Sequence, residues 1–229
     1  MKNKYQNIFL TKAEEFDDFS SNFIRQKLEK LDKKKVLNIV LSGGSTPLPV
    51  LYKLKEANLN WSKINFFLAD ERLVNINSSK SNYKNLNNAF FKYISSKGYP
   101  FLQEKVSFES MVSTYKNNIK DNVDFIKPNQ PKFDMVILGM GEDGHTASLF
   151  PDTDALKVID DFVVINNVPQ LNCQRVTLTF PALISCEEII VLIKGEKKTK
   201  VFEDIIAGKG EKYPIAKLLK TKMNWIVGK

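Results

Sequence analysis

Cysteine, histidine and long hydrophobic runs are scarce in this 229-residue chain, which has two cysteines and one histidine. Cys173 and Cys186 form no CxxC pair and are too few for a disulfide scaffold, so we expect two reduced thiols. One histidine cannot build a histidine-rich metal site, and we expect no metal. No apolar run approaches the roughly 20 residues of a membrane-spanning helix, and the first residues lack the apolar stretch of a signal peptide. We therefore expect a cytoplasmic protein without a membrane partner.

The excess of positive charge is modest and dispersed. The chain has 34 basic and 26 acidic residues, a net charge of +8, which suits either nucleic acid or an anionic small molecule. The densest basic run, Lys33, Lys34 and Lys35, falls between an expected helix and an expected strand. This placement favours a solvated turn over a nucleic-acid patch, so we expect no nucleic-acid partner.

Short apolar runs alternate with segments of helical spacing along the whole chain. Several runs are apolar throughout, as expected for strands buried on both faces of a parallel sheet. The alternation predicts an α/β fold with three layers, α/β/α, around a mainly parallel, Rossmann-like central sheet in one domain over residues 1–229. Residues 127–132 are expected to form a loop. The expected strands are 36–41, 64–69, 133–138, 162–165, 176–180, 189–193 and 224–227, and the expected helices are 16–31, 47–57, 83–93, 111–125 and 199–206.

A glycine pair follows the strand expected at residues 36–41. Gly43 and Gly44 allow close backbone approach to a ligand, Ser45 or Thr46 suits a helix cap, and Pro47 suits the first helical position. The resulting helix start offers free N–H groups and a partial positive charge, which favour phosphate or carboxylate binding. A simple capped turn explains the same residues, and the Walker pattern is absent.

Three charged residues follow the next expected strand. Asp70, Glu71 and Arg72 stand at its carboxyl end, where ligands bind in open α/β sheets. Arg72 suits an anionic oxygen, and the alternative is an ion pair with Asp70 or Glu71. Ser81 or Asn82 is expected to cap the following helix.

The segment after residues 133–138 carries the only histidine. It contains GxGxxG at Gly139, Gly141 and Gly144, but the acid expected to end the following strand is missing, which argues against a dinucleotide site. His145 lies in the same loop, and histidine accepts protons near neutral pH. Asp143 is expected either to orient the imidazole ring or to stabilise the turn.

Residues 139–151, GMGEDGHTASLFP, resemble the GxGxDGHTASLFP signature of the 6-phosphogluconolactonase family. The resemblance spans about residues 8 to 227, but Asn75 replaces a common proline and the tail after Trp225 is short. It implies hydrolysis of 6-phospho-D-glucono-1,5-lactone to 6-phosphogluconate in the oxidative pentose phosphate pathway, with no cofactor. The other matching segments, in family order, are residues 42–47, 70–72, 174–179 and 195–198, followed by Pro214 and Trp225.

The resemblance implies a role for each matching residue. His145 is the expected general base for water, with Asp143 beside it. Backbone N–H groups of residues 139–144, including Gly141 and Gly144, are expected to stabilise the oxyanion. The substrate phosphate is expected against Gly43, Gly44, Ser45 and Thr46, with help from Arg72, Arg175 or Lys198, and Asp70 is expected to contact substrate. Arg175 could equally be a packing arginine at a strand start, and Lys198 a solvated helix residue.

Three alternatives remain open. The glucosamine-6-phosphate isomerase/deaminase shares a similar GxGxDGH loop but continues with a segment like IAFNEP, whereas this chain continues with TASLFP. A sugar-phosphate-binding protein without catalysis and a nucleic-acid-binding protein are the other two. We expect a monomer. The hypothesis of an enzyme requires that the imidazole of His145 and the glycine pair face one shared cleft.

Overall fold

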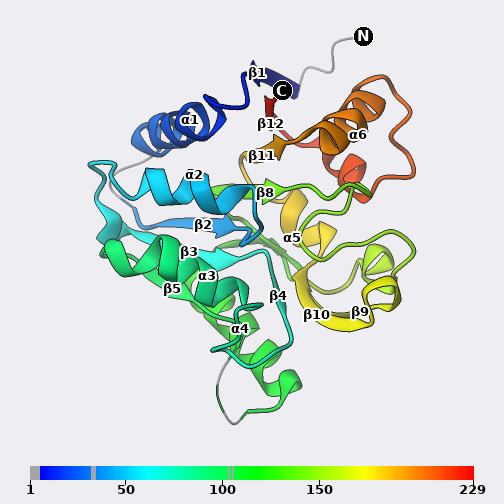
Figure 1. The fold of residues 1–229 in the computed structure, drawn as a ribbon. Coiled ribbons are helices and arrows are strands. Elements are labelled where there is room, and N and C mark those ends of the chain that lie inside the picture. The colour runs from blue at the N-terminus through cyan, green and yellow to red at the C-terminus, as the bar shows by residue number, and fades with distance from the viewer. Residues whose placement is uncertain (1–5, 32–34, 103, 105) are drawn as a thin grey trace.

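A seven-stranded parallel sheet forms the centre of the molecule. The computed structural model describes residues 6–31, 35–102, 104 and 106–229. All six strand pairings of the sheet are parallel, which confirms the expected α/β class. The strand order is β1 (Gln6–Thr11), β12 (Met223–Gly228), β11 (Ile189–Lys194), β8 (Met135–Gly139), β2 (Leu37–Leu41), β3 (Ile64–Leu68) and β5 (Lys97–Tyr99), so the first and last strands in the sequence are neighbours (Figure 1).

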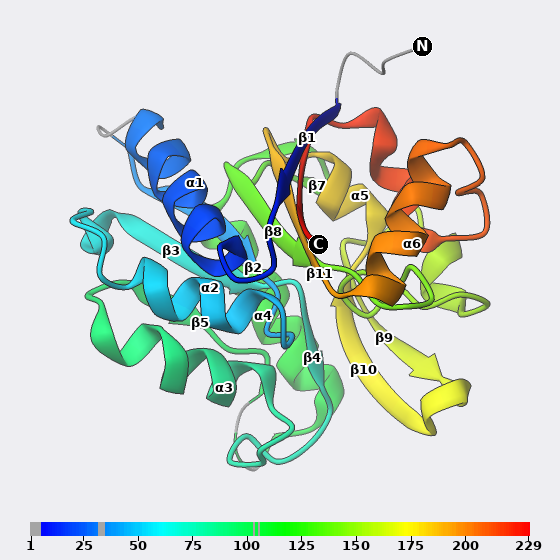
Figure 2. The same ribbon diagram turned by 45° about the horizontal axis from the view of Figure 1, so that its top comes forward.

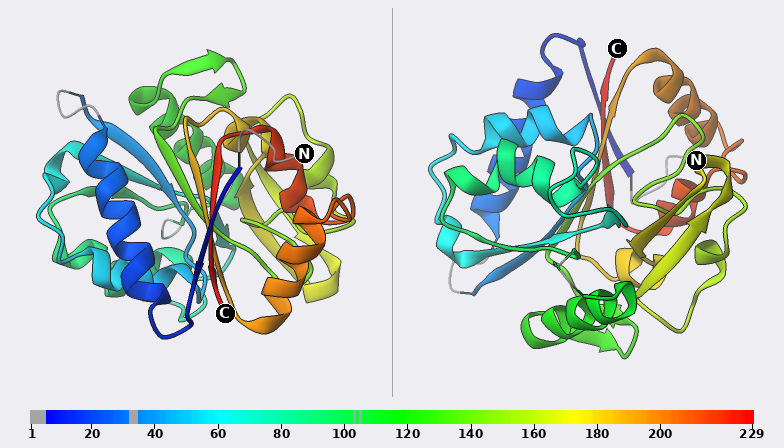
Figure 3. Two further views of the ribbon diagram at one scale, coloured as in Figure 1. Left: turned by 90° about the horizontal axis from the view of Figure 1, so that it is seen from above. Right: turned by 60° about the horizontal axis from the view of Figure 1, so that its bottom comes forward.

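Helices cover both faces of this sheet. Phe66 and Phe67 are neighbours on β3 and point to opposite faces: the Phe66 ring meets Phe90 and the Phe67 ring meets Tyr115. Figure 3 shows α1 and α2 on one side of the strands and α6 on the other. The helices are α1 (Phe16–Lys30), α2 (Pro47–Leu54), α3 (Asn82–Ala89), α4 (Phe108–Asn122), α5 (Phe180–Ile184) and α6 (Glu196–Ile206). No helix in the described residues is long and apolar enough to cross a membrane.

A second, three-stranded antiparallel sheet extends from the central one. It consists of β4 (Asp70–Arg72), β10 (Cys173–Leu178) and β9 (Val163–Val168), and Figure 2 shows β9 and β10 projecting beyond the central sheet. The strands expected at 162–165 and 176–180 therefore exist but do not belong to the central sheet. The second runs from Cys173 to Leu178, because Thr179 is already the N-cap position of α5, which begins at Phe180.

Several expected boundaries are wrong. Residues 127–132 are not a plain loop, since β6 (Phe125–Lys127) and β7 (Gln130–Pro131) form a short hairpin. α2 ends three residues early, and the helix expected at 83–93 is α3 followed by a separate helical turn at Phe91–Tyr93. α4 begins at Phe108 because Ser107 caps it, accepting from Ser110 N at 3.3 Å. Of the three-lysine run, Lys33 and Lys34 lie outside the described residues, and Lys35 pairs with Asp134 at 2.5 Å.

The connections between strands decide where a ligand can bind. From β2 the chain proceeds toward β3 and β5, and it then returns to β8 on the other side of β2. The strand order therefore reverses between β2 and β8. In open α/β sheets, ligands bind beyond the carboxyl ends of strands at such a reversal.

Candidate active site

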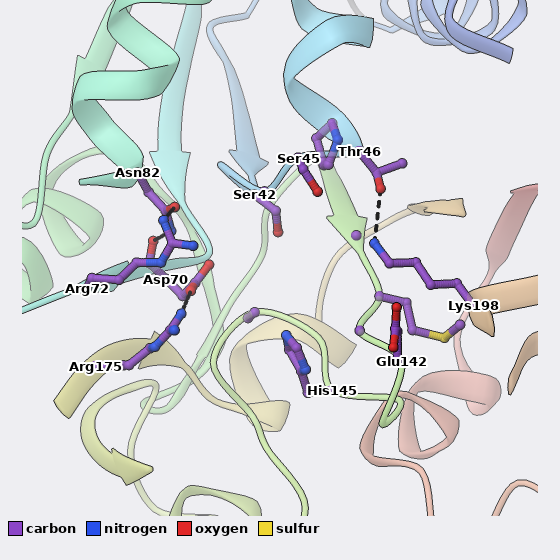
Figure 4. A pocket seen from close by; sticks show the side chains of 16 residues that line it. Ser42, Ser45, Thr46, Asp70, Arg72, Asn82, Glu142, His145, Arg175 and Lys198 are labelled. Atoms are coloured by element: carbon purple, nitrogen blue, oxygen red, sulfur yellow. Dashed lines mark hydrogen bonds and ion pairs between the residues drawn. The ribbon is translucent and has the colours of Figure 1, made fainter. Parts of the chain in front are cut away.

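A cleft of about 320 Å³ opens at this reversal (Figure 4). Its walls come from the turns after β2 and β8 and from β4, with one residue each from α3, β10 and α6. Three of the expected site residues do not line it: Gly43, Asp143 and Gly144. The expected residues that do line it are Gly44, Ser45, Thr46, Asp70, Arg72, Gly141, His145, Arg175 and Lys198, joined by Ser42, Pro47, Asn82, Gly139, Met140, Glu142 and Ala147.

The turn after β2 forms one part of the rim. Thr46 occupies the N-cap position of α2, but its side chain makes no capping bond, so the expected side-chain cap at Ser45 or Thr46 is wrong. The Leu48 N–H donates to Gly44 O at 3.2 Å and closes the first turn. Pro47 has no N–H, which leaves the N–H groups of residues 44–46 as the donors of this helix start.

Lys198 lies beside that helix start. It belongs to α6, and its Nζ donates to Thr46 Oγ1 at 3.2 Å. No carboxylate of the described chain lies within ion-pair distance of Lys198. Burial lowers its pKa below the ordinary value of 10.5, and the charge of Glu142 opposes that effect. The expected alternative of a freely solvated lysine does not fit this contact.

The loop after β8 folds tightly around His145. The Gly141 N–H donates to His145 O at 2.9 Å, and the Gly144 N–H donates to Gly141 O at 3.1 Å. The N–H groups of Gly141 and Gly144 therefore already have partners within the loop, and the oxyanion role expected of the N–H groups of residues 139–144 remains a prediction. Gly144 has φ of +75°, and a Cβ there would come within 2.6 Å of Tyr213.

Asp143 fixes the imidazole of His145. The ring Nδ1 lies 2.6 Å from Asp143 Oδ1, and the backbone N–H of His145 donates to the same oxygen at 3.1 Å. Asp143 thus both orients the ring and stabilises the turn. With Nδ1 as the donor, Nε2 is the free acceptor of a neutral ring, an assignment made from the hydrogen-bond network. The ring also stacks on Phe150, with centroids 4.0 Å apart.

The pKa of Asp143 reflects this contact. Burial favours a higher pKa, but the hydrogen bond and the charge of His145 outweigh burial and lower the pKa below 3.8. The carboxylate is therefore ionised near neutral pH and ready to stabilise a protonated ring.

The opposite wall contains two arginines on paired strands. Arg175 lies within β10 rather than at its start, and it is opposite Arg72 of β4 in the strand register. Arg175 Nη1 lies 4.0 Å from Asp70 Oδ2, and Asp70 also accepts from Ser148 Oγ at 2.6 Å. Arg72 makes neither expected ion pair: its Nη1 donates to Lys80 O at 2.9 Å and to Asn82 Oδ1 at 2.6 Å.

Glu71 lies behind this wall and links β4 to the start of α3. Its side chain is fully buried and accepts from the N–H groups of Arg72, Asn82 and Tyr83 and from Ser81 Oγ, at 2.6–3.0 Å. Burial raises its pKa above 4.5 despite the three backbone donors. Ser81 is the cap of α3, as expected, since its hydroxyl accepts from Lys84 N at 3.1 Å.

Several lining or supporting residues had no expected role. Ser42, Ser148 and Phe150 stand inside the motifs noted in the sequence, so their position was the available signal. Asn82 was noted only as a possible cap. Among the described residues, no group of three or more His, Cys, Asp or Glu side chains is placed to hold a metal ion.

Known proteins resemble this chain over nearly its whole length. The family model of glucosamine-6-phosphate isomerases/6-phosphogluconolactonase matches residues 11–227. This chain belongs to that family. A 6-phosphogluconolactonase of Thermotoga maritima is 37% identical over 93% of this chain and 94% of its own, and one of Chlamydia pneumoniae is 30% identical over 98% and 89%.

The fold agrees as well. A crystal structure of 6-phosphogluconolactonase from Thermotoga maritima superimposes with a TM-score of 0.84 at 33% identity, covering 98% of this chain and all of the other. The family model includes both an isomerase and a lactonase activity. The family model alone does not choose between the two reactions, but the curated relatives at 37% and 30% identity and the Thermotoga maritima structure are all named 6-phosphogluconolactonase, which supports the lactonase reaction over the isomerase reaction.

Proposed function

We propose that this protein hydrolyses 6-phospho-D-glucono-1,5-lactone to 6-phosphogluconate, with His145 as the general base. The observation that carries the proposal is the shared cleft. The oriented imidazole, the helix start and a lysine that no carboxylate of the described residues pairs with line one cavity. Relatives named 6-phosphogluconolactonase at 37% and 30% identity support the same reaction.

The reaction follows from the state of His145. Water attacks the lactone carbonyl carbon while Nε2 takes a proton from it, and the ionised Asp143 stabilises the resulting imidazolium. The tetrahedral intermediate then breaks the bond to the ring oxygen, which takes the proton back from Nε2 of the His145 imidazolium and leaves as the C5 hydroxyl, so the neutral ring is restored. Positioned acid–base catalysis of this kind contributes about 10²–10⁴ in rate. The product carboxylic acid releases its proton to solvent.

The substrate phosphate lies between the start of α2 and Lys198. This assignment rests on charge balance, since Arg175 already faces Asp70 and Arg72 already has two fixed acceptors. Like Arg72, Lys198 has no carboxylate partner in the described chain, but its Nζ is held by a single hydroxyl, Thr46 Oγ1, beside the N–H donors of residues 44–46. Arg72, Arg175 and Asp70 then face the remaining oxygen atoms of the substrate.

The test is an assay in which the lactone is generated freshly and acid release is followed with and without the protein. Wild-type protein should accelerate release, and His145→Ala should lower kcat by about 10²–10⁴ while binding 6-phosphogluconate almost normally. The spontaneous rate of lactone opening is subtracted throughout. Near-normal turnover by folded His145→Ala protein would exclude His145 as the base.

Lys198 is tested by product binding. Lys198→Ala should weaken binding of 6-phosphogluconate by about 30-fold, because a charge-assisted contact to phosphate is lost, with kcat little changed. Lys200→Ala, an exposed lysine of the same helix, is the matched control and should bind normally. Equal affinities for both variants would remove Lys198 from the phosphate site.

A second assay, ammonia release from glucosamine 6-phosphate, tests the family's other activity. Ammonia release from glucosamine 6-phosphate, without acceleration of lactone opening, would replace the lactonase proposal. We further propose a cytoplasmic monomer that binds no nucleic acid. Size-exclusion chromatography with light scattering tests the monomer, and a salt-dependent gel shift with DNA or RNA would contradict the last point.

A further inference from the structure

Asn82 makes a hydrogen bond to each of the three residues of β4. It is the first residue of α3, it is 2% exposed, and it lines the cleft. Its backbone N–H donates to Glu71 at 2.6 Å, its Nδ2 donates to Asp70 O at 2.9 Å, and its Oδ1 accepts from Arg72 at 2.6 Å. All polar atoms of its side chain are therefore engaged on the arginine wall.

Asn82 also packs against the turn after β2. A Cβ at Gly43 would come within 2.8 Å of the Cβ of Asn82, so a glycine at position 43 makes room for this side chain. This contact explains why Gly43, although outside the cleft lining, stands in the glycine pair. The position of α3 and the position of the phosphate-facing turn are thereby linked through Asn82.

The bond from Asn82 orients Arg72 along one edge only. Both fixed acceptors, Asn82 Oδ1 and Lys80 O, take hydrogen bonds from Nη1. No described residue accepts a hydrogen bond from the Arg72 Nε. An amide oxygen is also neutral, so it holds the guanidinium without cancelling its charge, unlike Asp70 beside Arg175.

We propose that Asn82 is a positioning residue that aligns the Arg72 guanidinium with an anionic or carbonyl oxygen of the ligand while preserving its positive charge. The inference rests on the proposed function, since it assigns Arg72 to ligand binding. Figure 4 shows Asn82, Arg72 and Asp70 together on one side of the cleft, opposite Lys198. Asn82 acts through Arg72 and not on the reacting atoms.

A double-mutant cycle tests this role, with 6-phosphogluconate binding measured by calorimetry. Asn82→Ala should weaken binding about tenfold, and Arg72→Ala should weaken it at least as much. The double variant should bind no more weakly than Arg72→Ala alone, because Asn82 has nothing left to align. Additive losses would overturn the proposal, since a general structural defect weakens binding whether or not Arg72 is present.

Three further variants complete the test. Asn85→Ala, on the same helix with a side-chain bond to Ser79 O, is the control and should bind normally. Asn82→Ser, which suits a helix start, replaces the alanine variant if that fails to fold. Asn82→Asp keeps an oxygen for Arg72 but adds a negative charge, so it should weaken binding at least tenfold; wild-type affinity in this variant would overturn the neutral-acceptor role.

Turnover separates this inference from the proposed function. If wild-type protein opens the lactone but the cycle is additive, only the role of Asn82 fails. If wild-type protein does not open the lactone, the proposed function fails, while the binding cycle still reports on Asn82. In an active enzyme the loss should appear in KM, with kcat changed less than about twofold, because Asn82 contributes ground-state alignment.

Discussion

Asp143 and Glu71 each hold one wall of the cleft, and their surroundings differ in kind. The Asp143 side chain is 43% exposed and accepts from the ring and the backbone of His145, two residues away. Glu71 is fully buried and accepts from four neutral donors, three of them ten to twelve residues away. The pKa of Asp143 is lowered by His145 against the effect of burial, whereas burial raises the pKa of Glu71.

Each wall also depends on one glycine. A Cβ at Gly141 would overlap the imidazole ring of His145, and a Cβ at Gly43 would press on Asn82. The first glycine therefore leaves room for the base, and the second leaves room for the residue that orients Arg72. In both walls a carboxylate and a glycine surround a functional side chain. The wall of His145 is formed by residues close in sequence and is partly exposed to solvent, whereas the wall of Arg72 is formed by residues far apart in sequence and is buried.

Because of this difference, we expect changes in one wall to affect catalysis and changes in the other to affect the stability of the fold. The wall of His145 is a loop held mainly by its own bonds, so a change there should alter catalysis with little effect on the fold. The wall of Arg72 joins β4, the capped start of α3 and the turn after β2 through buried polar groups. A change there should lower the free energy of unfolding together with ligand affinity.

The largest expected effect is on the local wall. Asp143→Asn places an amide beside Nδ1 and removes the negative charge that favours the reactive tautomer and the imidazolium. We expect kcat to fall roughly 10³-fold, with the free energy of unfolding changed by less than about 1 kcal/mol. Lactone assays and urea denaturation measure the two quantities. Asp154→Asn, at an exposed ion pair with Lys157, is the control; a drop in kcat below tenfold would show that Asp143 serves only the turn.

The next effect is on the buried wall. Glu71→Gln leaves one acceptor oxygen for four donors, so at least two buried donors lose their partner. Each loss costs about 1–3 kcal/mol, partly offset because a buried charge is removed, so we expect a net loss of about 2–3 kcal/mol. Urea denaturation at neutral pH measures it. Glu29→Gln, in the partly exposed pair with Arg25, should cost less than about 1 kcal/mol, and equal losses for both variants would contradict the buried role of Glu71.

The same contrast explains what the sequence could predict. The buried strands β2, β3, β8, β11 and β12 are apolar runs, and their existence follows from pattern alone. β4 and β5 have three residues each, too few for a pattern, and β1 is largely exposed. The pairing of β10 with β4 is a tertiary contact that no local periodicity encodes.

In the site, the sequence predicted the contacts of the wall of His145 but not those of the wall of Arg72. Asp143 stands two residues before His145, so their contact follows from the motif. The expected ion pair of Arg72 with its acidic neighbours is wrong, because Glu71 turns inward to the start of α3 and Arg72 reaches Asn82 instead. The roles proposed for His145, Lys198 and the arginines remain predictions that the variants above test.

The smallest expected effect is on the pH dependence of stability, where the two carboxylates should act with opposite sign. The pKa of Asp143 is lowered from 3.8, so its contribution to the free energy of unfolding is present above that pH and is lost as pH falls through the lowered pKa. The pKa of Glu71 is raised from 4.5, so its contribution is fully present below 4.5 and is lost as pH rises through the raised pKa. Urea denaturation of the wild type, Asp143→Asn and Glu71→Gln, from about pH 3 to about pH 7, measures both. The advantage of the wild type over Asp143→Asn should shrink toward acid, and its advantage over Glu71→Gln should shrink toward neutral pH. Slopes of the same sign would mean that the two walls do not differ in the way their burial and partners imply.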